Sequence, residues 1–228
     1  MWTTLLYAGG ASLPLAVGAA VGVRWQPPQR LVAALLAFAA GALVVSAAFE
    51  LFEPAYEDGG AGRATAAFLA GAVVFVVADG LLERRTAGST AGFALLAGVT
   101  LDGIPENAAL GVSLNDAASV ALLVAIFVSN VPEAVAGARS MVERGRSPRF
   151  VLGVWCATTV LLALAVVAGR YLFAGAGPQA LAWPLAFAGG AVLASVIDTL
   201  APEAFGEGGP LIALASAAGF VTGFLLGA

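Results

Sequence analysis

The sequence predicts an all-α, polytopic membrane protein with eight transmembrane helices. Of its 228 residues, 61% are hydrophobic and only 11% are charged, whereas soluble proteins have roughly 45–50% apolar and about 25% charged residues. The mean hydropathy is +0.97. A water-soluble fold of this size could not bury so much apolar surface, so most of the chain is expected to lie in a lipid bilayer.

Eight apolar segments are long enough to cross the hydrocarbon core, which takes roughly 20 residues of helix. They lie near 5–23, 31–52, 65–82, 90–112, 118–138, 150–168, 181–200 and 211–227. The first segment lacks a preceding positive region and is long enough to span, so we expect a helix there and not a cleaved signal peptide. Small residues recur in all eight and let helices approach closely. We therefore expect residues 1–228 to form a single transmembrane domain.

The arginines predict how this bundle is oriented. Eight of the ten lie in the loops after the first, third and fifth segments: Arg24, Arg30, Arg84, Arg85, Arg139, Arg144, Arg146 and Arg149. Because cytoplasmic loops carry an excess of basic residues, both termini are expected to lie outside the cell (plasma) membrane. The outer loop after the second segment is acidic, with Glu53, Glu57 and Asp58. It is expected either to attract cations near an entrance or to be a merely solvated turn.

The composition also excludes several classes of function. A net charge of −4 with no lysine leaves no basic face for nucleic acid. The chain has no histidine, which excludes Ser-His-Asp and Cys-His catalysis, His-ligated haem and His-containing zinc sites. A single cysteine, Cys156, excludes an intramolecular disulfide and a Cys-based metal cluster. Any chemistry must use carboxylates, amides, hydroxyls and the backbone, and no prosthetic cofactor is expected.

Six acidic residues lie within or at the ends of the predicted spans. They are Glu50, Asp79, Asp102, Glu106, Glu133 and Asp198. A charge near the bilayer centre costs about 2.5–3.5 kcal/mol even on insertion scales, so such residues need a partner. The spans contain no arginine that could pair with them, which leaves protons, a cation, or both.

Two short motifs in the fourth and fifth spans repeat the same order of residue types, 27 residues apart. They read Asp102-Gly103-Ile104-Pro105-Glu106-Asn107 and Ser129-Asn130-Val131-Pro132-Glu133-Ala134. Residues four apart share a helix face, so Asp102 stacks with Glu106 and Ser129 with Glu133. Each proline removes a backbone donor and exposes a carbonyl one turn back. Any one of these features could be a simple kink or a protonated structural acid. Together they favour an oxygen-lined site for a divalent cation.

The depths of the two glutamates raise a geometric question. On straight, centred antiparallel helices, Glu106 and Glu133 would differ in depth by roughly 10 Å at 1.5 Å per residue. Kinks or an offset hairpin must bring them together if they share an ion. A related segment, Asp198-Thr199-Leu200-Ala201-Pro202-Glu203, ends the seventh span.

At these residues the chain resembles the ZIP family of divalent-metal transporters. In that family the fourth helix carries a motif like His-Asn-x-Pro-Glu-Gly, and the fifth one like His/Gln-Asp/Asn-x-Pro-Glu-Gly. The resemblance extends to Phe38-Ala39-Ala40-Gly41 and Ala201-Pro202-Glu203-Ala204. It implies a ZIP-like homodimer in the cell membrane that is a transporter and not an enzyme. Its substrates would be divalent metal ions, zinc foremost and also Fe-, Mn- or Cd-type ions, moved toward the cytoplasm.

The resemblance also implies a set of metal ligands. Glu106 and Glu133 match the family's two metal-binding glutamates, Asp102 stands in place of the helix-4 histidine, and Asn130 matches the Asp/Asn of helix 5. Further residues that could bind metal or line the path are Ser129, Asn107, Asp198, Glu203, Glu50 and Asp79.

The chain departs from the family pattern in ways that bear on the metal. Gly103 and Ser129 replace the usual Asn and His/Gln, and Asn107 and Ala134 replace the glycines. The sixth span offers only Cys156, Thr158 and Thr159 where many relatives have a glutamate, and the loop before the fourth span is only 83–88. Oxygen ligands suit Mn, Mg and Ca better than imidazole does, so discrimination in favour of zinc should be weaker.

Two other functions remain open at this point. One is a non-transporting ZIP relative that binds metal or regulates a partner. The other is an intramembrane aspartyl protease, because Asp79-Gly80 and Asp102-Gly103 supply two membrane aspartates. These lack the Gly-x-Gly-Asp and Tyr-Asp contexts of such enzymes.

Overall fold

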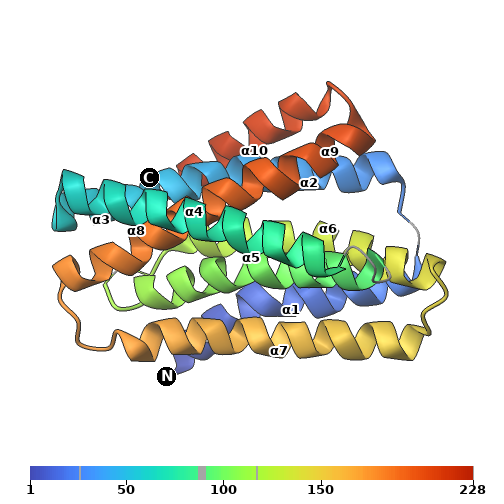
Figure 1. The fold of residues 1–228 in the computed structure, drawn as a ribbon, viewed down its shortest axis with the longest axis horizontal. Helices are drawn as coiled ribbons and strands as arrows, with labels where there is room; N and C mark the ends of the chain where they lie inside the picture. Colours follow the sequence, from blue (N-terminus) through green and yellow to red (C-terminus); the bar gives the residue numbers. More distant parts are fainter. Residues whose placement is uncertain (26, 87–90, 117, 228) are drawn as a thin grey trace.

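The computed structural model describes residues 1–25, 27–86, 91–116 and 118–227, and within these ranges every regular element is a helix. The elements are α1 (Trp2–Arg24), α2 (Gln29–Ser46), η1 (Ala47–Phe52), α3 (Glu53–Gly59), α4 (Ala61–Thr86), α5 (Ala91–Ser113), α6 (Val120–Glu143), α7 (Pro148–Leu172), α8 (Pro178–Ser195), η2 (Val196–Leu200), α9 (Ala201–Gly208) and α10 (Ile212–Gly227). Because α2–η1–α3 and α8–η2–α9 are each continuous, these elements form eight helical segments (Figure 1).

The expected class, an all-α polytopic membrane protein, is confirmed. Six of the described helical segments are long and apolar enough to cross a membrane, and α10 is a shorter apolar helix of 16 residues. The second and seventh segments run on to Gly59 and Gly208, beyond the apolar stretches expected at 31–52 and 181–200. The additional helical turns contain the polar residues Glu53 and Glu203. Hydropathy alone ends each span before them, so it does not place them in a helix.

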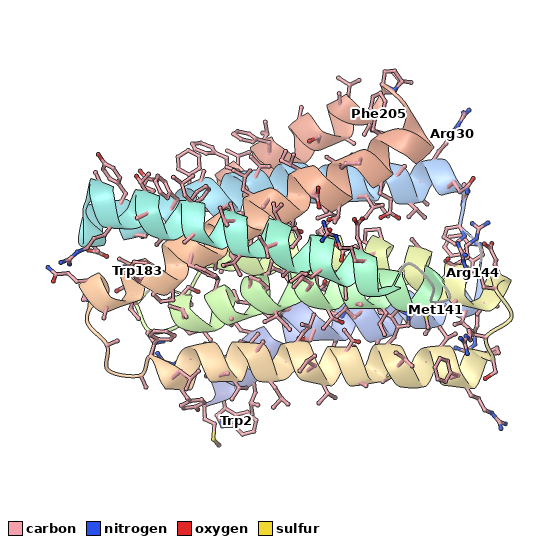
Figure 2. The ribbon with its side chains drawn as sticks, viewed as in Figure 1. Trp2, Arg30, Met141, Arg144, Trp183 and Phe205 are labelled. Atoms are coloured by element: carbon pink, nitrogen blue, oxygen red, sulfur yellow. The ribbon has the colours of Figure 1, made fainter. Side chains whose placement is uncertain are left out.

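The two ends of the bundle differ in charge. Both chain termini lie at the same end (Figure 1). Arg30 and Arg144 lie together at the opposite end, away from Trp183 (Figure 2). We call these the terminal end and the arginine-rich end.

The helices pack closely because glycines meet backbone carbonyls of their neighbours. A Cβ at Gly41 of α2 would strike the Ser216 carbonyl of α10, and one at Gly190 of α8 would strike the Phe68 carbonyl of α4. A similar approach joins α1 to α6, where Gly18 faces the Val131 carbonyl. Small residues thus set the helix spacing, as is usual in membrane bundles.

The second and seventh segments share an internal repeat. Phe38-Ala39-Ala40-Gly41 in α2 corresponds to Phe187-Ala188-Gly189-Gly190 in α8, and each is followed five residues later by a serine, Ser46 or Ser195. In both segments the serine is the last α-helical residue before a stretch of π-helix, η1 or η2. Such widened turns occur frequently at functional sites.

Candidate metal centre

The two proline-containing motifs lie on α5 and α6, and both helices continue through Pro105 and Pro132. Asp102 is 7% exposed and Glu106 is 3% exposed. Glu133, which is partly buried, lies within electrostatic range of both. The depth difference expected for straight, centred helices therefore does not isolate the two glutamates from each other.

The Asp102 carboxyl group lies close to two hydroxyl groups, those of Thr199 and Ser195. Thr199 on η2 is placed to donate to Asp102 Oδ2 at 3.3 Å, although its hydroxyl lies closer to the Ser195 carbonyl, at 2.7 Å. Asp102 Oδ1 is buried without a well-formed hydrogen bond among the described residues, and the nearby buried Ser195 hydroxyl lies within hydrogen-bonding range of the same carboxyl group. Buried polar atoms are nearly always paired. The remaining lone pairs of the buried Asp102 Oδ1 are therefore available to a cation.

The amides beside the glutamates are already oriented by the backbone. Asn130 Nδ2 donates to the Ala11 carbonyl of α1 at 2.7 Å. Asn107 Nδ2 donates to the Gly103 carbonyl at 2.8 Å, and its Oδ1 is buried with no partner in the described part of the chain. In both residues the nitrogen is engaged, so the oxygen is the atom left to face other groups.

Ser129 and the polar residues of α7 are engaged with their own helices. Ser129 Oγ donates to the Ile126 carbonyl at 3.1 Å. Thr158 and Thr159 donate to the carbonyls four residues before them, at 3.3 and 2.9 Å. Cys156 is exposed on the outside of the bundle. Among the described residues, α7 thus offers no carboxylate to the centre.

A second group of acids lies next to Asp102. The carboxyl groups of Asp79 on α4 and Asp198 on η2 lie within hydrogen-bonding range of each other, and both lie within electrostatic range of Asp102. Asp198 is exposed and Asp79 partly so. Within the described ranges, however, no three acidic side chains converge closely enough to form a ready-made metal cluster.

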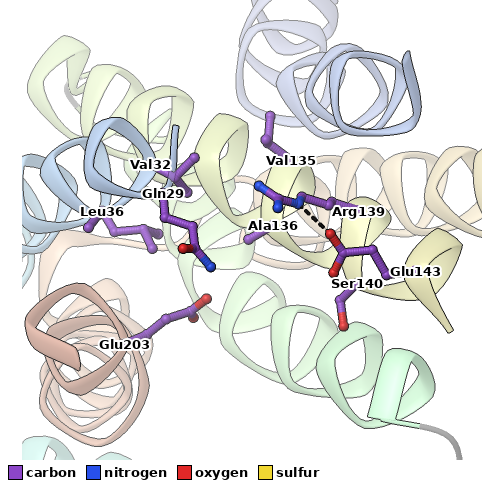
Figure 3. Close-up of a pocket in the computed structure, with 10 residues that line it drawn as sticks. Gln29, Val32, Leu36, Val135, Ala136, Arg139, Ser140, Glu143 and Glu203 are labelled. Atoms are coloured by element: carbon purple, nitrogen blue, oxygen red, sulfur yellow. Dashed lines mark hydrogen bonds and ion pairs between the residues drawn. The ribbon is translucent and has the colours of Figure 1, made fainter. Parts of the chain in front are cut away.

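A cavity of about 230 Å³ lies toward the arginine-rich end, between the start of α2, the last turns of α6, and α9 (Figure 3). Figure 3 shows the side chains of Gln29 and Glu203 reaching toward each other across it. Arg139 Nε donates to Glu143 Oε1 at 2.7 Å, and its Nη1 donates to the Pro27 carbonyl at 3.3 Å. Glu203 lines this cavity and also lies within electrostatic range of Glu133. It is therefore the acid that links the centre to the arginine-rich end.

The structure thus brings most of the sequence-predicted residues into one region. Asp102, Glu106 and Glu133 lie within electrostatic range of one another, Asp79 and Asp198 lie within such range of Asp102, and Glu203 lies within such range of Glu133. Glu50 is not part of this group, because it lines a separate cavity between α2 and α10.

Sequence reasoning missed several groups around the centre. Thr199 and Ser195 contact Asp102 from a helix that lies far along the chain. Thr199 lies inside the quoted Asp198–Glu203 segment, which was a usable signal, and Ser195 is marked by the repeat. The Ala11 carbonyl carried no signal of its own, and Arg139 stood out only as one of the arginines that predict the orientation.

Comparison with known proteins gives a distant relationship. No protein-family model matches the chain. It is 29% identical over 184 residues to an Arabidopsis thaliana protein named "Putative zinc transporter". The match covers 75% of this chain but only 30% of the plant protein. This chain is therefore a polytopic membrane protein and a distant homologue of a protein named as a zinc transporter, in agreement with its resemblance to the ZIP family.

Proposed function

We propose that this protein moves divalent metal ions across the cell membrane toward the cytoplasm, with zinc as the foremost substrate. The observation that carries the proposal is that buried Glu106 and Glu133, supplied by the two Pro-Glu motifs, lie within electrostatic range of each other. Acids inside a membrane bundle mark ion pathways by default. The distant homology to the plant protein named "Putative zinc transporter" supports the same class of substrate.

In this proposal Asp102, Glu106, Asn130 and Glu133 hold the ion. Their oxygens would replace part of its hydration shell, and the buried, unpaired Asp102 Oδ1 supports this role. Since the described acids do not form a ready-made three-carboxylate cluster, the ion itself would draw the carboxylates together. Ser129 and Asn107 are the nearest candidates for additional oxygen ligands.

The exit would run from Glu133 past Glu203 into the cavity near the arginine-rich end. The negative charges of Glu133 and Glu203 would both attract the cation toward the arginine-rich end. The pairing of Arg139 with Glu143 supports an open route, because it holds the guanidinium against another carboxylate. Asp79 and Asp198 would form a side branch of the ion path, next to Asp102.

Uptake into sealed vesicles, measured with a panel of Zn²⁺, Mn²⁺, Fe²⁺ and Cd²⁺, tests the proposal. Glu106→Gln and Glu133→Gln should each reduce uptake to the rate of empty vesicles. Glu57→Gln, a matched change at an exposed acid of α3, should leave it unchanged. Metal binding without uptake in the parent protein would instead favour a non-transporting relative. Uptake at the parental rate in either centre variant would contradict the site.

Orientation and assembly form part of the same proposal. With the arginine-rich end in the cytoplasm, a cysteine introduced by Arg146→Cys should react with an impermeant maleimide only after the cells are permeabilised.

The ZIP resemblance further supports a homodimer, which the mass of the purified protein in detergent, corrected for bound detergent, would reveal. A monomeric mass would contradict that part alone.

A further inference from the structure

A second cavity, of about 260 Å³, lies between the second helical segment and α10. Its lining includes Ser46, Glu50, Glu53 and Gly227. The α3 turn and the last turn of α10 lie at the terminal end, away from the cavity of Figure 3 (Figure 1). One of its walls is fixed by an edge-to-face contact between the Phe49 and Phe224 rings, whose centroids are 5.4 Å apart.

One buried polar atom of this cavity has no partner in the described part of the chain. Ser46 is 1% exposed, and its Oγ has no hydrogen-bond partner among the described residues. The described part of the chain supplies no basic side chain to this lining. A Cβ at Gly227 would strike Glu50 Oε1, so the Glu50 carboxylate is directed at α10 across the cavity. A buried hydroxyl and two carboxylates therefore share one small space.

The internal repeat gives an independent reason to regard Ser46 as a site residue. Ser46 occupies in α2 the position that Ser195 occupies in α8, directly before a π-helix. Ser195 Oγ is also buried, and it lies within hydrogen-bonding range of the carboxyl group of Asp102. A buried serine hydroxyl near carboxylates, directly before a π-helix, thus occurs twice.

We propose that Ser46, Glu50 and Glu53 form a second binding site for a divalent cation, at the terminal end of the bundle and separate from the metal centre. The proposal rests on the proposed function only for the kind of ion. Carboxylate and hydroxyl oxygens suit hard divalent cations such as Mn²⁺. Three protein groups leave room for water to complete the coordination of the ion.

Mn²⁺ binding to the purified protein, followed by electron paramagnetic resonance, tests this site. The background is the double variant Glu106→Gln/Glu133→Gln, which removes the centre as a competitor. We expect one bound Mn²⁺ in this background, and a Kd at least about tenfold higher after a further Glu50→Gln change. Glu57→Gln, on α3 but outside the cavity lining, is the matched control and should not change the Kd. No bound Mn²⁺ in the background, or an equal effect of both changes, would overturn the site.

The role of Ser46 can also be tested with a variant that should bind a metal ion more tightly, so that the test does not depend on lost binding. Thiolates prefer soft ions, so Ser46→Cys in a Cys156→Ala background should bind Cd²⁺ at least about tenfold more tightly than the background alone. Adding Glu50→Gln should reverse this gain. Cd²⁺ affinity unchanged by Ser46→Cys in protein of unchanged melting temperature would mean that the hydroxyl does not face the ion.

The two proposals fail separately. Mn²⁺ binding at the site of Ser46, Glu50 and Glu53 with no uptake in any vesicle preparation would refute transport but not this site. Uptake with no Mn²⁺ bound to the Glu106→Gln/Glu133→Gln protein would refute this site but not transport.

Discussion

The side-chain amide of Asn130 on α6 donates a hydrogen bond of 2.7 Å to the carbonyl of Ala11 on α1. This bond fixes the direction of the amide, with the nitrogen against α1 and the oxygen on the other side. It lies along the same pair of helices that Gly18 brings into close contact at the Val131 carbonyl. Any movement of α1 against α6 would therefore also turn a proposed metal ligand.

Asn130→Asp separates the two roles of this residue. The change keeps an oxygen for the ion but removes the donor to Ala11 and leaves a buried carbonyl without that partner, so the apo protein should lose roughly 1–3 kcal/mol of stability. Saturating Zn²⁺ should recover most of the loss, because ligand binding stabilises the folded state. Melting temperatures in detergent, with and without Zn²⁺, check both parts. A deficit that Zn²⁺ leaves intact would mean that residue 130 does not contact the ion.

Close packing between α5 and α7 should be sensitive to a single methyl group. A Cβ at Gly169 would strike the Ala108 carbonyl, whereas a Cβ at Gly153 of the same helix would meet nothing within 4 Å. Overpacking costs typically 1–3 kcal/mol. We therefore expect Gly169→Ala to lower the melting temperature by several degrees, and Gly153→Ala, which replaces an uncrowded glycine inside a helix, to leave it unchanged or raise it slightly. Equal melting temperatures for the two variants would contradict this helix contact.

Metal binding should weaken as the pH falls. Ligating carboxylates must be deprotonated, so protons compete with the ion and are released when it binds. Binding is then strongest at the high end of the range and is lost on acidification. The chain has no histidine, the side chain whose ordinary pKa lies near 6.5. Calorimetry in buffers of different ionisation enthalpy measures the released protons, and binding unchanged between about pH 4 and pH 8 would exclude carboxylate ligands.

The fold class could be predicted because burial in a bilayer imposes strong constraints on composition. Few charges are tolerated, so the acids that remain, such as Glu106 and Glu133, stand out against an apolar background. The Pro-Glu motifs then mark α5 and α6 without any knowledge of packing.

The partners of those acids could not be predicted in the same way. The contact of Asp102 with Thr199 joins residues 97 positions apart, and it depends on how α8 is rotated against its neighbours. That rotation follows from glycine contacts such as Gly190 against the Phe68 carbonyl. The π-helices η1 and η2 also rotate the residues that follow Ser46 and Ser195 toward a different side of the helix than a regular α-helix would. A sequence pattern read with a period of 3.6 residues does not register this shift.

The identity of the residue at position 102 should influence which metal is preferred. Asp102 stands where ZIP relatives have a histidine, and its unpaired Oδ1 supports direct contact with the ion. Imidazole favours zinc over manganese more strongly than a carboxylate does. Asp102→His should therefore raise the ratio of zinc to manganese uptake. Zinc binds ahead of manganese with either ligand under the Irving–Williams order, so the ratio and not the rank is the quantity to measure. Uptake of both ions would be compared in vesicles with matched expression, and Glu57→His serves as the control, since Glu57 is an exposed acid of α3 outside the proposed ligand set. A ratio that Asp102→His leaves unchanged, or that both variants shift equally, would show that Asp102 does not touch the transported ion.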